Sequence, residues 1–436
     1  MVSDEGEKLV RLRDCGDLRN GINFNRTQEG AGLPVLKVKD FGDHFFVPAD
    51  GLDELDSERI SVPPEQYLEE GDTVIIRSNG NGQLVGRCLY VHSLKRPTTF
   101  SGFCIRFRPN PKIIHPGFAS YFLRSPISRQ RFVAYGSGTG IQNLNQATIG
   151  NVELILPSLD EQRAIARVLS ALVDKIELNR QTSHTLEAMA RALFKSWLVD
   201  FDPVTEKATG RKPYGMNEET ALLFPSAFEG SGLEAIPKGW KVKPLDEIAN
   251  YENGLALQKF RPTGYKYLAV IKIRELRQGY SDSTSDKASP NIKSPFIVHD
   301  GDIIFSWSGS LLVEIWCGGE GALNQHLFKV TSANYPKWFY YFWTKEHLED
   351  FQDIASGKAT TMGHIQRHHL SAALSVVPSS ECLERADKII APMIEAIVNN
   401  RTQSRALAAL RDSLLPRLLS GEIRVRQAEK TLAETI

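Results

Sequence analysis

Residues 160–199 have the sequence DEQRAIARVLSALVDKIELNRQTSHTLEAMARALFKSWLV. Apolar and small side chains recur in it at alternating spacings of four and three residues, the heptad pattern of a helix that pairs with another helix. Acidic residues begin the segment, where the dipole of a helix favours negative charge. At ~1.5 Å per residue, the predicted helix is roughly 60 Å long. Its seam consists of Ile165, Leu169, Leu172, Ile176, Asn179, Ser183, Leu186, Ala190, Leu193 and Trp197.

The same seam occurs again 221 residues further along the chain. Its members there are Ala386, Ile390, Met393, Ile397, Asn400, Ser404, Leu407, Arg411, Leu414 and Leu418. Asn179 and Asn400 hold the same seam position, where a polar residue lowers stability but fixes register and partner orientation. Pro392 lies inside the second helix and predicts a kink or a late start. We predict that the two helices pair through Leu169, Leu172, Ile176, Asn179, Leu186, Leu193, Ile390, Met393, Ile397, Asn400, Leu407 and Leu414.

The segments outside the helices also repeat in the same order. The shift between copies drifts from 220 to 235 residues, as loops of different length would cause. Short β-branched runs after Gly-Asp predict strands that follow turns. The matching segments are Asn20-Gly21 and Asn253-Gly254, Leu36–Asp40 and Ile271–Glu275, Gly71–Ile75 and Gly301–Phe305, Pro116–Phe122 and Pro336–Phe342, Pro157-Ser158 and Pro378-Ser379, and Asn179-Arg180 and Asn400-Arg401.

Together these repeats predict an α+β protein. Two α/β domains are separated and joined by two long antiparallel helices that form a coiled coil, with an internal pseudo-two-fold repeat. A stretch rich in Gly, Pro and charge would return the chain along the helices. The predicted boundaries are 1–157 for the first domain, 158–200 for the first helix, 201–237 for a linker, 238–377 for the second domain, 378–420 for the second helix and 421–436 for a tail.

Charge is balanced overall but segregated along the chain. The 436 residues hold 52 basic and 52 acidic side chains. Asp40–Asp72 carries eleven acids and one base, whereas Thr73–Val152 carries ten bases and no acid. A second acid-free run, Gly254–Arg274, carries five bases. Clustered cations without anions indicate a polyanionic partner, so we expect both basic runs to face outward.

Other functional classes find little support. No run of 18 apolar residues predicts a membrane span, and the acidic start is unlike a secretory or transit signal. The five cysteines are scattered, which disfavours a disulfide framework or a zinc site and fits the cytoplasm. Common nucleotide-binding, hydrolase and metalloprotease motifs are absent. His364 and His368 have metal-ligand spacing, but no acidic or Cys ligand is near them in sequence, and we expect no metal site.

Three segments resemble the specificity subunits of type I restriction–modification enzymes. They are Ser137–Asn145 (SGTGIQNLN), Leu154–Arg163 (LILPSLDEQR) and Phe194–Phe201 (FKSWLVDF), of which the last two are quite specific. The resemblance covers nearly the whole chain. The second copy departs from it, because Pro378–Cys382 lacks the Glu-Gln-Arg triplet that opens the first long helix.

The resemblance implies a non-catalytic DNA-recognition subunit of a type I restriction/DNA-methyltransferase complex. Each domain would be a target recognition domain for one half of a split site in double-stranded DNA, and the helices would set the separation of the halves. It implies docking of two methyltransferase (M) subunits and of restriction (R) subunits. S-adenosylmethionine, ATP and Mg²⁺ would be bound by those partners and not by this chain.

The DNA contacts are predicted from the basic runs and from the matched positions of the two copies. Arg suits guanine, Asn and Gln suit adenine, and cations neutralise phosphate. Two other functions stay open: a coiled-coil scaffold whose basic domains bind RNA or an acidic protein, and a stand-alone nuclease or methyltransferase. The predicted DNA-binding residues are Arg77, Ser78, Asn79, Asn81, Gln83, Arg87, Lys95 and Arg96 in the first domain, and Lys259, Arg261, Lys266, Ser306, Trp307 and Ser308 in the second.

Overall fold

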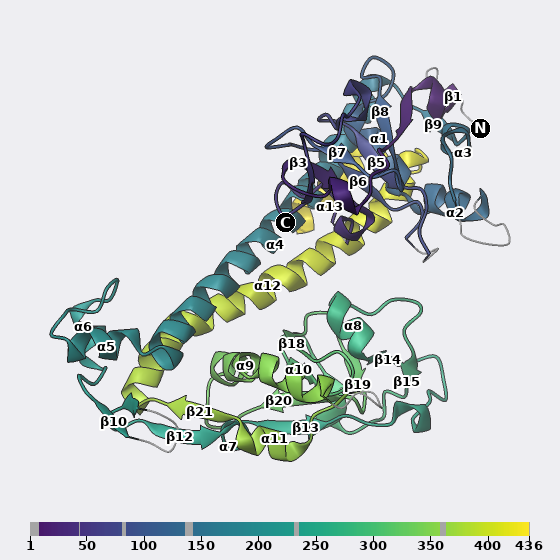
Figure 1. Cartoon of the computed structure of the whole chain (residues 1–436). Helices are drawn as coiled ribbons and strands as arrows, with labels where there is room; N and C mark the ends of the chain where they lie inside the picture. Colours follow the sequence, from purple (N-terminus) through teal and green to yellow (C-terminus); the bar gives the residue numbers. More distant parts are fainter. Residues whose placement is uncertain are drawn as a thin grey trace. The chain divides into compact units, whose positions relative to one another are not determined.

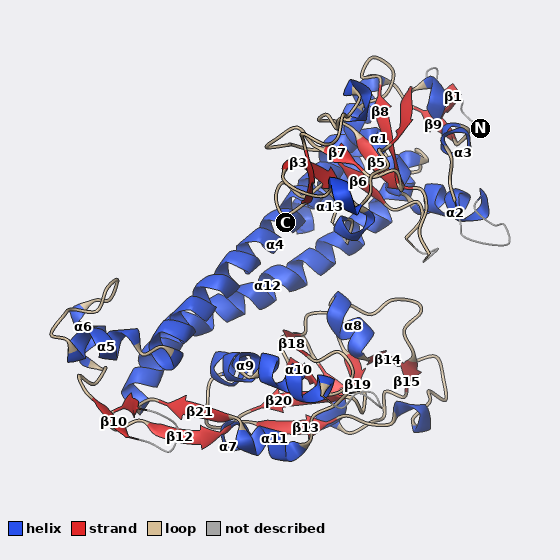
Figure 2. Ribbon diagram, in the orientation of Figure 1, coloured by secondary structure: helices blue, strands red, loops and turns tan. Residues whose placement is uncertain are grey.

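The chain folds into two compact units (Figure 1). Unit 1 comprises the residues up to Ile176 and those from Leu407 onward, and unit 2 comprises Glu177–Ala406. Strands and helices are mixed in both units (Figure 2), which confirms the predicted α+β class. The computed structural model describes residues 8–42, 44–80, 84–135, 143–230, 235–357 and 363–435, without the side chains of 133–135 and 432–435.

Unit 1 is built around a four-stranded antiparallel sheet of order β2-β8-β5-β6. A second sheet has the order β4-β3-β7, with β3 and β7 parallel, and β1 pairs with β9 in a ribbon. The elements are β1 Lys8–Arg11, β2 Gly16–Asn20, β3 Gly32–Leu36, β4 Asp53–Asp56, β5 Thr73–Ile76, β6 Cys88–Tyr90, β7 Thr99–Phe100, β8 Cys104–Pro109, α1 Pro116–Arg124, α2 Pro126–Tyr135, α3 Gln146–Gly150, β9 Glu153–Leu156 and α13 Val425–Thr435.

Unit 2 repeats this plan with the sheet β13-β20-β17-β18, the sheet β15-β14-β19-β16 and the ribbon β12-β21. The parallel pair is now β14 and β19. The internal repeat is therefore confirmed. The elements are α5 Asp202–Ala208, α6 Glu218–Leu222, β10 Phe228–Gly230, β11 Ala235–Pro237, β12 Lys241–Pro244, α7 Leu245–Ile248, β13 Asn250–Asn253, β14 Leu268–Ile271, α8 Ile273–Gln278, β15 Lys287–Ala288, β16 Ile297–Val298, β17 Ile303–Ser306, β18 Leu312–Ile315, β19 Gly321–Leu323, β20 Leu327–Thr331, α9 Lys337–Glu346, α10 Leu348–Ser356, α11 Arg367–Ala372 and β21 Leu374–Val377.

The repeated Asn-Gly pair has the same steric cause in both units. A Cβ atom on Gly21 would lie 2.2 Å from the carbonyl oxygen of Phe100. A Cβ atom on Gly254 would lie 2.2 Å from the carbonyl oxygen of Asn324. Only glycine lets the chain pass so close to a neighbouring backbone.

The repeated Gly-Asp pair forms the same turn in both units. Gly71 and Gly301 have φ angles of 94° and 86°, a left-handed conformation that favours glycine. The aspartate that follows each glycine lies beside a cation on an interior strand of the main sheet, so charge attraction ties the turn to the sheet. The pairs are Asp72 and Arg106 at 3.7 Å in unit 1, and Asp302 and Lys329 at 2.7 Å in unit 2.

Two long helices contribute to both units. Helix α4 spans Leu159–Phe194 and continues through one π-helical turn at Lys195–Val199, and α12 spans Ser380–Leu419. The first part of α4 shares a core with the last part of α12 in unit 1, and the reverse holds in unit 2, so the helices run antiparallel as predicted. The shared residues are Leu169, Leu172, Ile176, Leu407 and Leu414 in unit 1, and Leu186, Leu193, Ile390, Met393 and Ile397 in unit 2.

The polar seam position is asymmetric. Asn179 is 2% exposed, and its Nδ2 donates to Oε1 of Gln403 at 2.8 Å and to the carbonyl oxygen of Asn400 at 3.4 Å. The side-chain partner of Asn179 is thus Gln403, about one helical turn beyond Asn400, whose own contribution is its carbonyl oxygen.

Replacing Asn179 with leucine is expected to raise the free energy of unfolding of unit 2 by on the order of 1 kcal/mol, because apolar packing replaces a buried polar contact. Gln403 is exposed and can bond to water instead. Gln403→Ala should lower the free energy of unfolding of unit 2, because it leaves the buried amide of Asn179 with only its longer bond to the carbonyl oxygen of Asn400. All six tryptophans lie in unit 2, so denaturant unfolding followed by tryptophan fluorescence measures both. Equal destabilisation by both substitutions would contradict this account.

Three boundary predictions need correction. Helix α12 begins at Ser380 and runs through Pro392, so the late start is wrong; the proline is exposed, and the carbonyl it cannot bond can face water. The predicted linker 201–237 contains α5, α6, β10 and β11, and its Phe224 and Ile236 belong to the core of unit 2. The predicted tail contains α13, whose Ala428 is fully buried.

Candidate nucleic-acid interface

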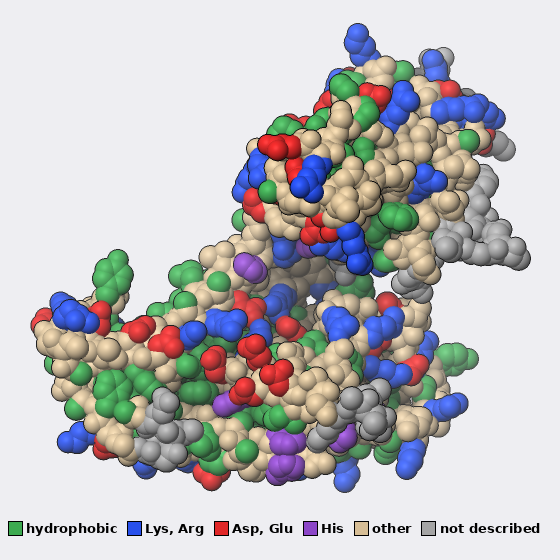
Figure 3. Space-filling model, viewed as in Figure 1, with side chains coloured by type: hydrophobic (Ala, Val, Ile, Leu, Met, Phe, Trp, Pro, Cys, Tyr) green, Lys and Arg blue, Asp and Glu red, His purple; other side chains and the backbone are tan. Residues whose placement is uncertain are grey.

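Among the described residues, four of the ten bases in the basic run of unit 1 form ion pairs with the acidic run that precedes it in sequence. Lys and Arg side chains are interspersed with Asp and Glu on the face of unit 1 that Figure 3 shows. Separation of charge along the sequence is therefore not separation in space. The pairs are Lys95 with Asp50 (2.6 Å), Arg96 with Glu54 (2.7 Å), Arg106 with Asp72 (3.7 Å) and Arg108 with Asp72 (2.8 Å).

Part of the run also faces inward. Arg106 is 1% exposed. Arg124 donates to the carbonyl oxygens of His44, at 3.1 Å, and of Cys88, and burial lowers its pKa to about 10. The expectation that the whole run faces outward is wrong for these two residues. A strand buries every second side chain, and a cation at such a position is tolerated when a carboxylate or a carbonyl oxygen pairs with it.

One corner of unit 1 joins three distant segments. The N–H of Arg77, just after β5, donates to the carbonyl oxygen of Phe103 at 2.9 Å, and the carbonyl of Arg77 accepts from Leu144 at 2.8 Å. The Nε of Arg77 donates to Oδ1 of Asn143 at 3.3 Å, and Phe103 is 61% exposed. We call Arg77, Gly102, Phe103 and Asn143 the unit 1 corner.

Of the other DNA contacts predicted for unit 1, two lie next to this corner and three form bonds elsewhere in the unit. Ser78 forms an isolated β-bridge with Asn143 of the corner, and Asn79 follows Ser78 in sequence. Arg87 donates to the carbonyl oxygen of Gly42 at 3.0 Å. Lys95 and Arg96 are exposed, in the ion pairs given above. Asn81 and Gln83 lie outside the described residues.

Unit 2 builds the same corner from different side chains. The N–H of Trp307 donates to the carbonyl oxygen of His326 at 3.4 Å, and the carbonyl of Trp307 accepts from Ile365 at 3.0 Å. The bridge between Ser308 and His364 matches the one between residues 78 and 143. We call Trp307, Gln325, His326 and His364 the unit 2 corner. Sequence reasoning missed its Gln325 and His326, because they lie in no basic run and the matching Gly102 and Phe103 of unit 1 carry no charge.

Two predicted contacts of unit 2 are buried. Ser306 and Ser308 are 0% and 3% exposed, and the Ser306 hydroxyl donates to the carbonyl oxygen of Ser308 at 3.1 Å. Direct contact of these two serines with DNA is therefore wrong for this structure, because polarity in sequence does not show which face a residue occupies. Trp307 is half-buried and donates to Oδ1 of Asn253 at 3.0 Å.

A basic cleft of about 750 Å³ adjoins the unit 2 corner and includes its Gln325 and His326. Arg261 lines it and is exposed, and the described residues offer it no hydrogen bond or ion pair. Lys259 and Lys266 are exposed in the same loop. The charged residues that line the cleft are Arg261, Lys272, Arg274, Lys287 and one acid, Asp286. We call this the basic cleft.

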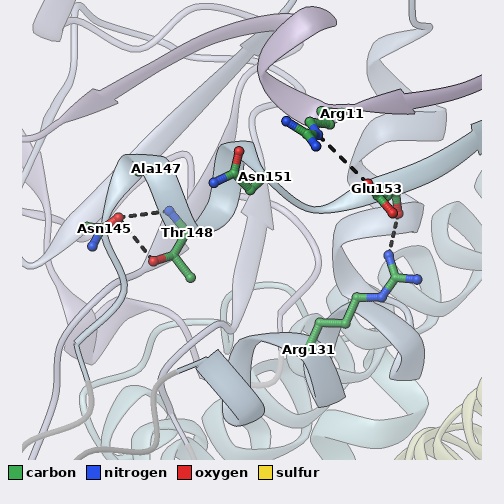
Figure 4. A pocket seen from close by; sticks show the side chains of 7 residues that line it. All are labelled: Arg11, Arg131, Asn145, Ala147, Thr148, Asn151 and Glu153. Carbon is green, nitrogen blue, oxygen red and sulfur yellow. Dashed lines mark hydrogen bonds and ion pairs between the residues drawn. The ribbon is translucent and has the colours of Figure 1, made fainter.

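A second cleft of about 600 Å³ lies in unit 1, beside β1, α3 and β9 (Figure 4). Its two arginines are both engaged by Glu153: Arg11 lies 3.8 Å from the carboxylate, and Arg131 donates to the carbonyl oxygen. Asn145 caps α3 by accepting from the N–H of Thr148 at 2.8 Å. The basic cleft also holds paired cations, Lys272 with Asp286 at 2.5 Å and Arg274 with Glu275 at 2.6 Å, but its Arg261 has no such partner among the described residues.

The histidines with ligand spacing have other surroundings. His364 packs edge-on against Trp307 at 6.3 Å, and the rings of His368 and His369 lie 4.0 Å apart. Over the described ranges, no group of three His, Cys, Asp or Glu is placed to hold a metal ion. Within the same ranges, no helix has the length and apolar character needed to cross a membrane.

Comparison with known proteins gives one consistent family. The model of the type I restriction modification DNA specificity domain matches residues 9–188 and 237–407. The specificity subunit of type I restriction enzyme MjaIX from Methanocaldococcus jannaschii is 26% identical over 438 residues, covering 96% of this chain and 94% of that protein. The specificity subunit of EcoKI from Escherichia coli is 25% identical over 458 residues, covering 96% and 93%.

A solved structure has the same fold. The S subunit of the type I restriction–modification system from M. genitalium aligns with a TM-score of 0.53 at 16% identity, covering 96% of this chain and 97% of that one. Two domains of mixed strands and helices joined by long helices are thus shared with a crystal structure.

Proposed function

The chain belongs to the type I restriction–modification DNA specificity family, and we propose that it selects a bipartite site in double-stranded DNA, one half-site per unit. The observation that carries this proposal is the pair of corners. Matched backbone bonds hold Arg77 and Phe103 in one unit and Trp307 and His326 in the other. Two corners with matched backbone bonds and different side chains suit a site whose halves differ in sequence.

The antiparallel helices would set the distance between the half-sites. Each helix is continuous, over Leu159–Phe194 and Ser380–Leu419, and each contributes to the core of both units. When two readers are joined by stiff elements, the half-site spacing becomes a geometric property of the protein.

Catalysis belongs to partner subunits, because the relatives are specificity subunits. We infer that the chain docks two methyltransferase subunits and then restriction subunits in the cytoplasm. S-adenosylmethionine, ATP and Mg²⁺ would be held by those partners.

Selection from a random duplex library by the full chain tests the proposal. We expect two enriched half-sites at a fixed separation, with affinity that falls steeply as salt rises. Binding of RNA or of an acidic protein without duplex selection would favour the scaffold alternative. Methylation or cleavage by the purified chain alone would favour the stand-alone enzyme.

Arg261→Ala is expected to weaken binding to all duplexes about equally, because we assign its exposed guanidinium to a phosphate, and a phosphate contact carries no sequence information. The slope of log affinity against log salt should fall by about 0.9 for the lost contact. Titration of a labelled duplex at several salt concentrations measures both. Lys388→Ala removes a similar exposed charge from α12 and serves as the control. If both variants behave alike, the basic cleft is not the phosphate contact.

A further inference from the structure

The two corners are built on one backbone framework. Besides the bonds already described, the N–H of Gly102 donates to the carbonyl oxygen of Ile22 at 2.7 Å, and that of Gln325 donates to Leu255 at 2.9 Å. Four positions therefore correspond one to one, and each carries a different chemistry in the two units. The matched positions are Arg77 and Trp307, Gly102 and Gln325, Phe103 and His326, and Asn143 and His364.

A hydrogen-bond relay orients the amide of Gln325. Its Nε2 lies 3.3 Å from Nε2 of His326, and Nδ1 of His326 lies 2.9 Å from the hydroxyl of Ser308. With the amide nitrogen of Gln325 facing the ring, Nε2 of His326 is the acceptor, and the tautomer that fits carries its proton on Nδ1, directed to Ser308. Ser308, which the sequence predicted to contact DNA, is thus buried beneath the corner and holds the ring of His326.

The free edge of this amide borders the basic cleft. Gln325 is half-buried and lines the cleft, and the described residues provide no partner for its Oε1 or for its second amide hydrogen. One acceptor and one donor side by side match N6–H and N7 of adenine in the major groove. Arg261 lines the same cleft and is placed to take a phosphate.

We propose that Gln325 is a specificity-determining residue that reads an adenine in the half-site bound by unit 2, oriented by His326 and Ser308. The assignment rests on the proposed function, since it presumes that unit 2 binds one half of a duplex site. It goes further by naming the base, the reading atoms and the residues that orient them.

The test is selection from a random duplex library by the full chain and by three variants. Gln325→Ala should lose an adenine preference of about tenfold or more at one position of one half-site. Gln325→Glu keeps the shape but offers only acceptors, so the preference should move toward cytosine, whose N4 amino group donates. Gln278→Glu makes the same change on α8, where the amide donates to the carbonyl oxygen of Tyr280, and should select the original site.

The outcomes separate the two levels of the argument. If the unmodified chain enriches no bipartite site, the proposed function fails. If it does and both Gln325 variants enrich the same bases, Gln325 does not read the site, and the assignment is overturned. The assignment is also overturned if the control Gln278→Glu changes the half-site in the same way as the two Gln325 variants.

Discussion

Replacing Asp72 with alanine is expected to lower the free energy of unfolding of unit 1 by about 3–5 kcal/mol, because it removes a buried carboxylate that bonds Arg108 and is the buried one of the two carboxylates beside the guanidinium of Arg106. Asp72 and Arg106 are each 1% exposed and lie 3.7 Å apart. The carboxylate also accepts two bonds of 2.8 Å from Arg108. Without it, Arg106 keeps only the bond of 2.9 Å to Asp17.

The distribution of tryptophan makes this measurable. Unit 1 contains none of the six, so circular dichroism should show an earlier denaturant transition while tryptophan fluorescence keeps its midpoint. Asp50→Ala breaks an ion pair whose side chains are 66% and 73% exposed, and should change stability by less than about 1 kcal/mol. Asp302→Ala should instead move the fluorescence transition, since it breaks the matching pair in unit 2. If Asp72→Ala and Asp50→Ala have equal effects, the buried pair does not hold the turn.

Lengthening both long helices by one heptad is expected to lengthen the selected spacer by about three base pairs without changing either half-site. Seven helical residues add roughly 10.5 Å, and one base pair rises ~3.4 Å. The insertions belong after Ile176 in α4 and after Ala406 in α12, because each helix leaves one unit and enters the other at that point. A whole heptad keeps the seam in register.

Selection from the random duplex library measures the spacer and the half-sites together. Insertion into α4 alone is the control: it offsets the two seams and should abolish selection. An unchanged spacer, or altered half-site bases with matched insertions, would contradict the proposal that the helices set the separation.

Some features of this protein follow from local rules and were readable in the sequence. The seam through Leu169, Leu172 and Ile176 requires a partner helix, because heptad spacing places those side chains on one face wherever the helix lies. Gly21 and Gly71 mark a close approach and a left-handed turn that other residues do not tolerate. The repeat, the helices and the family therefore follow from order and spacing alone.

Other features depend on which distant residues meet, and only the tertiary structure decided them. Strands and turns bring acids of Asp40–Asp72 beside four of the ten cations that follow, so part of the positive charge that the sequence offered to a polyanion is paired within the protein. Ser308 lies behind the surface, whereas Gln325 lines the basic cleft. Burial and pairing are properties of a packed arrangement, and residues far apart in sequence have no local signal of the neighbours they will acquire.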